Sequence, residues 1–327
     1  MATQLRPLSL GEVLDRTAEL YRTNFPLFAG IAAIFSGALL LAGFLQLGAQ
    51  ELLGYPNIAP GHEWAVAVIT VAGVLVALLL AGLSIAAITR AVAWIYLGEA
   101  TTIRAAVSSI APQLRRYLWV MTIVGFRAWA PMAALYGIIL AALFAYLPKG
   151  FLTNPAVMQS AGAQNPATLI ALGIGFLVLA PLFLAALVYG ILMSLRYSLA
   201  VPACVVEELP AREAIKRSIQ LSKGSRGRIF VLGLLVYVVR LVLGIVLGLP
   251  FILFAFKQHG HPIPIWMLAA QQIASFLVNT LIGPIYSTGL TLFYYDQRVR
   301  KEGFDIEWMM RSAGLTLQAG LPAAEHS

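Results

Sequence analysis

The chain has 327 residues, of which 60% are hydrophobic and only 11% are charged, and its mean hydropathy is +0.84. Soluble globular domains carry about 25% charged residues, so the composition excludes an ordinary soluble protein and indicates a chain that lies in a bilayer. The net charge is +8, but the basic residues lie beside apolar runs, so topology and anionic lipid explain them better than a nucleic acid does.

The N-terminal segment predicts a short helix before the first membrane span. The first 25 residues lack the apolar core of a cleavable signal peptide, so the first span is expected to serve as the insertion signal. Ser9 and Glu12 have the spacing of a capping box, and apolar and charged residues of 9–23 fall on opposite helix faces. We expect this helix to lie in the membrane interface, a soluble cap helix being the alternative.

Six apolar runs are long enough to cross a bilayer as helices. They cover residues 26–49, 65–89, 117–147, 168–195, 229–256 and 263–295. Of the 22 Lys and Arg residues, 18 flank these runs on one side, 2 lie in the opposite loops, and Arg127 and Arg240 lie within runs. The positive-inside rule therefore places both termini in the cytoplasm. The sequence predicts an all-α, six-span membrane protein.

The chain also reads as three copies of one unit, an interfacial helix followed by two spans. The units cover about 9–97, 101–200 and 210–296. With an offset of 201, the first interfacial helix matches the third at Glu12 and Glu213, Arg16 and Arg217, and Arg22 and Lys223. Convergence of amphipathic helices is the alternative. The prediction is a single membrane domain over 1–303, with three units around a central axis, and a cytoplasmic tail over 304–327.

Two arginines lie inside the apolar runs, each about 15 Å from the start of its span. A charge at that depth costs roughly 2.5–3.5 kcal/mol, so Arg127 and Arg240 are predicted to face protein, water or an anion. Backbone carbonyls, Gln271, Gln272, Asn279 or an anionic ligand are the candidate partners, because no Asp or Glu lies in the six runs. The hypothesis is an anion- or lipid-headgroup-binding site; snorkelling to the cytoplasmic surface is the alternative.

The segment 196–228 is the most basic part of the chain. It is predicted to present a cytoplasmic basic surface formed by Arg212, Lys216, Arg217, Lys223, Arg226 and Arg228. Its apolar face, Ala211, Ala214, Ile215 and Ile219, should pack on the bundle or dip into lipid. In the last run, Gly283 and Pro284 could form a helix hinge, with a simple packing kink as the alternative.

Signals for catalysis are missing from the sequence. It contains no Walker loop, no Gly-x-Ser-x-Gly, no His-Glu-x-x-His and no clustered intramembrane carboxylates, so no catalytic residues are assigned. The external histidines His62, His259 and His261 form a poor metal set, and the single Cys204 cannot build a cysteine cluster. Glu207 and Glu208 are expected to cap the following helix. We expect no cofactor, no metal and no enzyme activity.

Three segments carry a resemblance to a known family: VVEE at 205–208, AREAIKRSIQLSKG at 211–224 and YYDQRVRKEGFD at 294–305. With the N-terminal LRPLSLGEVLDRTAELYRTNF, they resemble the membrane domain of bacterial glycerophosphoryl diester phosphodiesterases; Ile219 departs from that pattern, where Trp is expected. The resemblance implies a stand-alone membrane domain without the catalytic domain, because in two-domain relatives the chemistry belongs to a separate soluble barrel.

These observations lead to two functional hypotheses. The first is a non-enzymatic multi-pass protein of the bacterial cytoplasmic membrane that contacts membrane lipids, anionic ones above all, or supports a membrane-protein partner. The second is a transporter or channel for an anionic or lipidic solute that uses Arg127 and Arg240.

Overall fold

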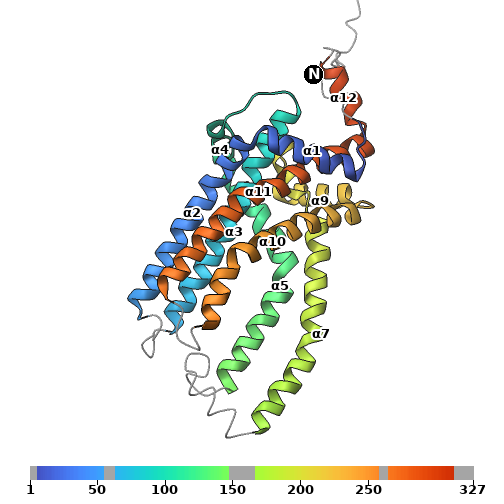
Figure 1. Cartoon of the computed structure of the whole chain (residues 1–327). Helices are drawn as coiled ribbons and strands as arrows, with labels where there is room; N and C mark the ends of the chain where they lie inside the picture. The colour runs from blue at the N-terminus through green and yellow to red at the C-terminus, as the bar shows by residue number, and fades with distance from the viewer. Residues whose placement is uncertain (1–5, 55–62, 147–165, 258–263, 313–327) are drawn as a thin grey trace, which may run out of the picture.

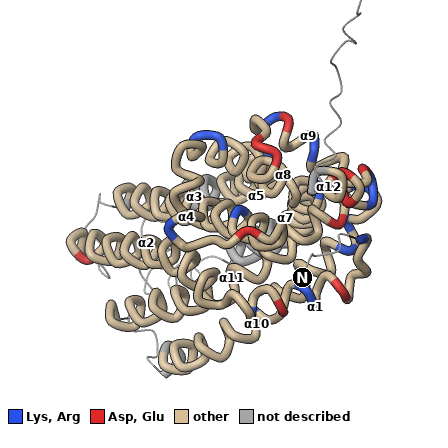
Figure 2. The backbone as a smooth tube through the Cα atoms, turned by 90° about the horizontal axis from the view of Figure 1, so that it is seen from above, with Lys and Arg blue, Asp and Glu red and all other residues tan. Residues whose placement is uncertain are grey.

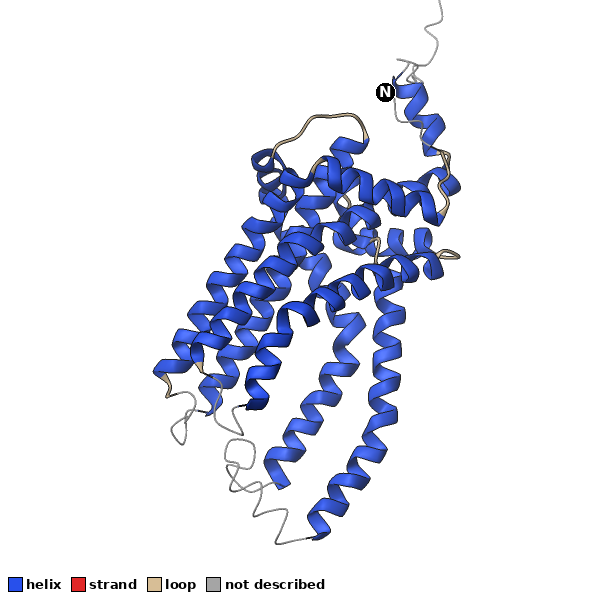
Figure 3. Cartoon of the chain, in the orientation of Figure 1, coloured by secondary structure: helices blue, strands red, loops and turns tan. Residues whose placement is uncertain are grey.

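The computed structural model describes residues 6–54, 63–146, 166–257 and 264–312. Every regular element in these ranges is a helix, as Figure 3 shows. Six of the helices are long and apolar enough to cross a membrane. The predicted fold class, an all-α protein with six spans, is therefore confirmed.

The first three helices follow the predicted order. α1 (Leu10–Thr23) begins with the predicted capping box, because the Ser9 hydroxyl accepts from the Glu12 N–H at 3.2 Å and Glu12 accepts from the Ser9 N–H at 2.7 Å. α2 (Phe25–Leu52) follows at once, and α3 (Glu63–Tyr96) returns with 34 residues, longer than the expected span. The apolar run defines only the lipid-crossing part of α3, and the helix continues beyond it.

The middle of the chain differs from prediction at both ends of its hairpin. The interfacial helix expected at the start of the second unit is short, because α4 (Ile103–Ile110) gives way to a 3₁₀ turn, η1 (Ala111–Gln113), at a proline. α5 (Leu114–Tyr146) and α7 (Pro166–Tyr197) are the two long helices. The short α8 (Ala200–Val206) was not predicted; all of its residues except Val201 and Val206 are buried.

The last part contains α9 (Ala211–Ser222), α10 (Arg226–Lys257) and α11 (Ile265–Glu302). α11 ends at Gly303, whose φ of +65° provides a left-handed C-cap, and α12 (Phe304–Ser312) follows within the expected tail. α11 is one unbroken helix across Gly283 and Pro284, so this segment is not a break between half-helices. Hinge motion there stays a prediction.

The long helices pack in two groups (Figure 1). α2, α3, α10 and α11 lie side by side, whereas α5 and α7 contact each other more than they contact any other helix. The order of one short helix and two long ones recurs three times along the chain, but the three hairpins are not packed equivalently. The internal repeat stays a prediction.

Short helices gather at one end of the molecule, formed by α1, α4, α8, α9 and α12, which we call the charged end. Seen from above in Figure 2, Lys, Arg, Asp and Glu cluster over these helices. The tightest packing also lies there, around the fully buried Tyr117, Leu199, Tyr294 and Tyr295. Large apolar side chains such as Leu177 and Val246 are exposed on the long helices, as expected of lipid-facing surfaces.

One aspartate fastens the N-terminal segment to the end of α11. The Asp296 side chain is fully buried and accepts from the Leu8 N–H at 2.7 Å, from Arg300 at 3.0 Å and from Arg228 at 3.3 Å. Arg228 and Arg300 also donate to the Leu8 carbonyl. We call these four residues the Asp296 clamp. Asp296 and Arg300 belong to the segment YYDQRVRKEGFD, so these two residues of that segment have a structural role.

Candidate functional site

The predicted basic surface divides into two kinds of residue. Arg217 and Arg228 are half-buried and form ion pairs, so they are occupied within the fold. Four others are exposed, and no ion pair or hydrogen bond of their side chains occurs within the described ranges: Arg212, Lys216, Lys223 and Arg226. Of the six residues of the predicted basic surface, these four are the ones without a side-chain partner in the described part of the chain.

Arg217 belongs to a network between α8, α9 and α11. Its guanidinium donates to Glu207 at 3.0 Å and to Glu302 at 2.7 Å, and Arg298 approaches the same two carboxylates at 3.7 and 3.3 Å. Burial lowers the pKa of Arg217, but the hydrogen bonds and charges of Glu302 and Glu207 outweigh it and raise the pKa. This arginine is therefore permanently charged and structurally engaged.

Glu207 and Glu208 do not cap α9, contrary to prediction. The N-cap of α9 is Pro210, whose side chain has no hydrogen-bond acceptor, and the chain turns before it at Glu208, which has a φ of +54°. Glu208 accepts from Arg90 at 3.3 Å, and its carbonyl accepts from Arg116. Arg90 thus helps to hold the loop before α9.

The orientation of α9 is fixed by its buried serines. Ser218 and Ser222 donate to the Arg196 carbonyl at 3.1 and 3.2 Å, and the Leu199 N–H donates to Ser218 at 3.2 Å. These bonds turn one face of α9 toward the junction of α7 and α8. Arg212 and Lys216 are four residues apart and share another face, which is directed toward α5.

A pocket of about 540 Å³ lies between that face of α9 and α5. Three cations line it: Arg127 from α5, and Arg212 and Lys216 from α9. Its remaining lining is largely apolar and aromatic: Trp119, Thr122, Ile123, Phe126, Ile215 and Ile219. We call it the α5–α9 pocket. No carboxylate is among the described residues that line it, so its potential is positive and suited to an anion.

Arg127 reaches this pocket from within its span. It lies 13 residues after the first residue of α5, about 20 Å along the helix axis. It lines the pocket together with Arg212 and Lys216 of α9, a helix of the charged end. Snorkelling and anion binding both stay predictions for this residue.

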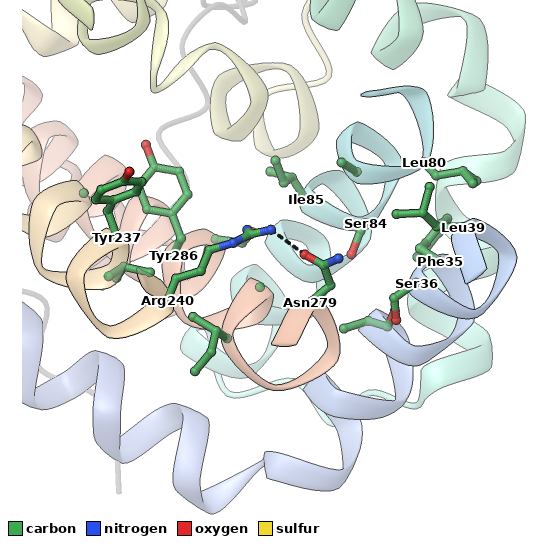
Figure 4. A pocket seen from close by; sticks show the side chains of 17 residues that line it. Phe35, Ser36, Leu39, Leu80, Ser84, Ile85, Tyr237, Arg240, Asn279 and Tyr286 are labelled. Atoms are coloured by element: carbon green, nitrogen blue, oxygen red, sulfur yellow. Dashed lines mark hydrogen bonds between the residues drawn. The ribbon is translucent and has the colours of Figure 1, made fainter. Parts of the chain in front are cut away.

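Arg240 lies in a different place, so the two intramembrane arginines do not form one site. It lines a cavity of about 350 Å³ among α2, α3, α10 and α11 (Figure 4). Its guanidinium donates to the Asn279 Oδ1 atom at 2.6 Å, one of the partners predicted from the sequence. Ser36, Ser84 and Ser287 line the same cavity. Ser36 and Ser84 are isolated polar residues in apolar stretches, a signal that could have drawn attention to them, whereas Ser287 stands next to Thr288 in a more polar run.

The other predicted positions contribute little to either site. His62, His259 and His261 lie outside the described residues. Within the described ranges, no group of three or more His, Cys, Asp or Glu residues could hold a metal ion. Gly283 lines the Arg240 cavity, whereas Pro284 is buried in α11.

One family profile matches residues 8–297, close to nine-tenths of the chain. The chain belongs to the DUF7847 family. This family is described as a domain of unknown function. The match runs from residue 8 to residue 297, so it includes Leu8, Arg228 and Asp296 of the clamp but not Arg300. No curated protein and no solved structure matches the chain.

Proposed function

We propose that this protein is a non-enzymatic multi-pass protein of the bacterial cytoplasmic membrane that binds an anionic phospholipid in the α5–α9 pocket. The observation that carries the proposal is the convergence of Arg127, Arg212 and Lys216, three cations without a partner among the described residues, on one pocket with apolar walls. A phospholipid phosphate supplies the missing negative charge, and arginine binds phosphate oxygens in a planar, bidentate manner.

The chemistry of the pocket wall suits the rest of a lipid. Trp119 and Phe126 are 57% and 73% exposed, and aromatic rings of this kind favour the level of the lipid headgroups. Ile123, Ile215 and Ile219 offer apolar surface next to the cations. A phosphate with attached acyl chains matches this combination, whereas a free inorganic anion would leave the apolar wall unused.

The charge distribution supports a cytoplasmic location for the pocket. The charged end carries the basic flanks that the positive-inside rule assigns to the cytoplasm, and the cytoplasmic leaflet is rich in anionic lipid. The acidic residues nearby are engaged: Glu207 and Glu302 with Arg217, and Asp296 with Arg228. That engagement supports a binding role over acid–base catalysis. The resemblance is to the membrane domain of these phosphodiesterases and not to their catalytic barrel, and it points the same way.

Two charge-matched double variants test the proposal. Arg212→Gln with Lys216→Gln removes two cations from the pocket, whereas Lys223→Gln with Arg226→Gln removes two exposed cations that do not line it. Each basic residue near a membrane surface contributes about 1 kcal/mol, so the pocket variant should bind anionic lipid about 30-fold more weakly. Native mass spectrometry with added phosphatidylglycerol measures the bound fraction.

The control variant separates a site from general attraction. We expect it to retain most of its phosphatidylglycerol, and Arg127→Gln to lose binding as the pocket variant does. Equal losses in the two double variants would show that lipid senses only net charge, and the pocket proposal would then fail. Phosphatidylcholine, which has no net charge, should bind weakly to all variants.

Transport of an anionic solute is the second candidate function. The Arg240 cavity favours it, because a cation and three serines line a space between four spans. Uptake of a labelled carboxylate into proteoliposomes would support transport. Binding without uptake would leave the lipid-binding role as the better account.

A further inference from the structure

The Arg240 cavity presents hydrogen-bond donors that the protein itself does not use. A guanidinium can only donate, so the bond at 2.6 Å requires that Asn279 turn its oxygen toward Arg240. The Asn279 Nδ2 group, with two N–H donors, then points elsewhere. Neither this group nor the other nitrogens of Arg240 form a hydrogen bond with another described residue.

A buried hydroxyl in the same cavity has no partner either. Ser287 is 1% exposed, and its Oγ atom makes no hydrogen bond among the described residues. Buried polar atoms are almost always paired in folded proteins, so an orphan beside a cavity points to a bound group that completes it. Ser84 also lines the cavity without a side-chain hydrogen bond in the described ranges, and Figure 4 shows it on the wall near Asn279.

Because the cavity lies deep in the membrane, the charge of Arg240 is costly unless a negative charge balances it. Arg240 lies 14 residues after the start of α10 and Asn279 lies 14 residues after the start of α11, about 21 Å from opposite ends of these helices. Both side chains therefore meet near the middle of the membrane. No carboxylate is found among the described residues that line the cavity, so the charge is uncompensated in a medium of low dielectric constant.

We infer that the Arg240 cavity binds a monoanionic carboxylate. Electroneutrality favours one negative charge against one guanidinium, and a carboxylate accepts bidentately from arginine while the Asn279 amide and the Ser287 hydroxyl donate to its remaining lone pairs. The volume of about 350 Å³ is within the range of small-molecule sites. The apolar lining, which includes Leu39, Leu80 and Val236, suits an alkyl chain.

The carboxylate could come from two sources, a fatty acid in the bilayer or a small acid from water, and the experiment distinguishes them. Full-length protein in phosphatidylcholine nanodiscs is titrated with labelled palmitate and, separately, with labelled acetate. Saturable palmitate binding with little acetate binding assigns the site to a fatty acid. Acetate binding of similar affinity assigns it to a water-soluble carboxylate. Absence of saturable binding of both probes to the wild-type protein would overturn the inference.

Variants connect the binding to the cavity. Arg240→Gln should weaken binding of the preferred carboxylate at least 10-fold, and Arg240→Lys should weaken it less. Ser287→Ala removes a single donor and should weaken binding about 2- to 10-fold. Arg226→Gln removes an exposed cation from the charged end of the same helix and should leave the affinity unchanged.

Two results would contradict the assignment even if palmitate binds. One is unchanged palmitate affinity in folded Arg240→Gln and Ser287→Ala proteins, since removing an intramembrane charge relieves a desolvation cost and should not prevent folding. The other is equal displacement of palmitate by hexadecanol, which has the chain but no charge. The site is independent of the α5–α9 pocket, so Arg127→Gln should leave palmitate binding intact while it reduces phosphatidylglycerol binding.

Discussion

Removal of the Asp296 carboxylate should detach the N-terminal segment from the rest of the fold. Asp296→Ala leaves the Leu8 N–H, bonded at 2.7 Å, without its acceptor, which costs about 1–3 kcal/mol. It also leaves Arg228 and Arg300 without their carboxylate. Loss of one partner of a fully buried pair costs about 3–5 kcal/mol, but these arginines are 28% and 38% exposed, so water solvates them in part.

The combined loss should be about 2–4 kcal/mol, which corresponds to a fall in melting temperature of about 4–8 °C. Hydrogen exchange gives a local readout, because the amide of Leu8 and the first turn of α1 should exchange faster in the variant. Glu208→Ala is the matched control: its carboxylate is 56% exposed and pairs with Arg90 at 3.3 Å, so its loss should cost less than about 1 kcal/mol.

If the Leu8 amide in Asp296→Ala exchanged hydrogen at the wild-type rate, the Asp296 clamp would not be what holds the N-terminal segment in place. An equal fall in melting temperature for Asp296→Ala and Glu208→Ala would contradict the energetic argument in the same way. That result would mean that burial of the carboxylate adds nothing to the strength of its ion pairs.

Two further predictions concern helix ends. The N–H and hydroxyl of Ser9, with the Arg6 guanidinium, lower the pKa of Glu12 from 4.5 to about 2. The ionised form therefore stabilises α1 above about pH 4.5, and this contribution is lost as the pH falls toward 2. In Glu12→Gln, the hydrogen exchange of α1, measured against wild type at each pH, should no longer depend on pH in this way. A pH profile equal to that of the wild type would contradict the argument. Gly303→Ala should destabilise the protein by about 1 kcal/mol, because φ is +65° while the new Cβ would meet nothing closer than Ile306 at 3.8 Å; a wild-type melting temperature would contradict the strain argument.

Local features were the most predictable from the sequence. The Ser9–Glu12 capping box and the six spans were correct because a cap depends on residues three apart and a span on the length of an apolar run. α8 and α12 were missed. α8 is short and largely buried against other elements, so its sequence shows no periodic pattern that distinguishes it from a loop.

The candidate sites could be predicted only in part. The sequence singled out Arg127 and Arg240 by their position in apolar runs, and it named Asn279 as a partner, which the hydrogen bond at 2.6 Å confirms. It placed Arg217 on the same basic surface as Arg212, although Arg217 is held by Glu207 and Glu302. Glu207 and Glu302 lie 10 and 85 positions away from Arg217 in the chain, so no local sequence pattern predicts that they pair with it.

The amino-acid sequence by itself determined the kind of molecule, because apolar length, composition and helix caps act over short stretches of chain. The tertiary structure alone decided which cations are available. Asp296 and the glutamates at the charged end pair with Arg228 and Arg217, and α9 turns Arg212 and Lys216 toward Arg127. Residues of four spans line the cavity that Arg240 borders. A charge can bind a ligand only where the fold leaves it unpaired, and pairing between distant residues is a property of packing.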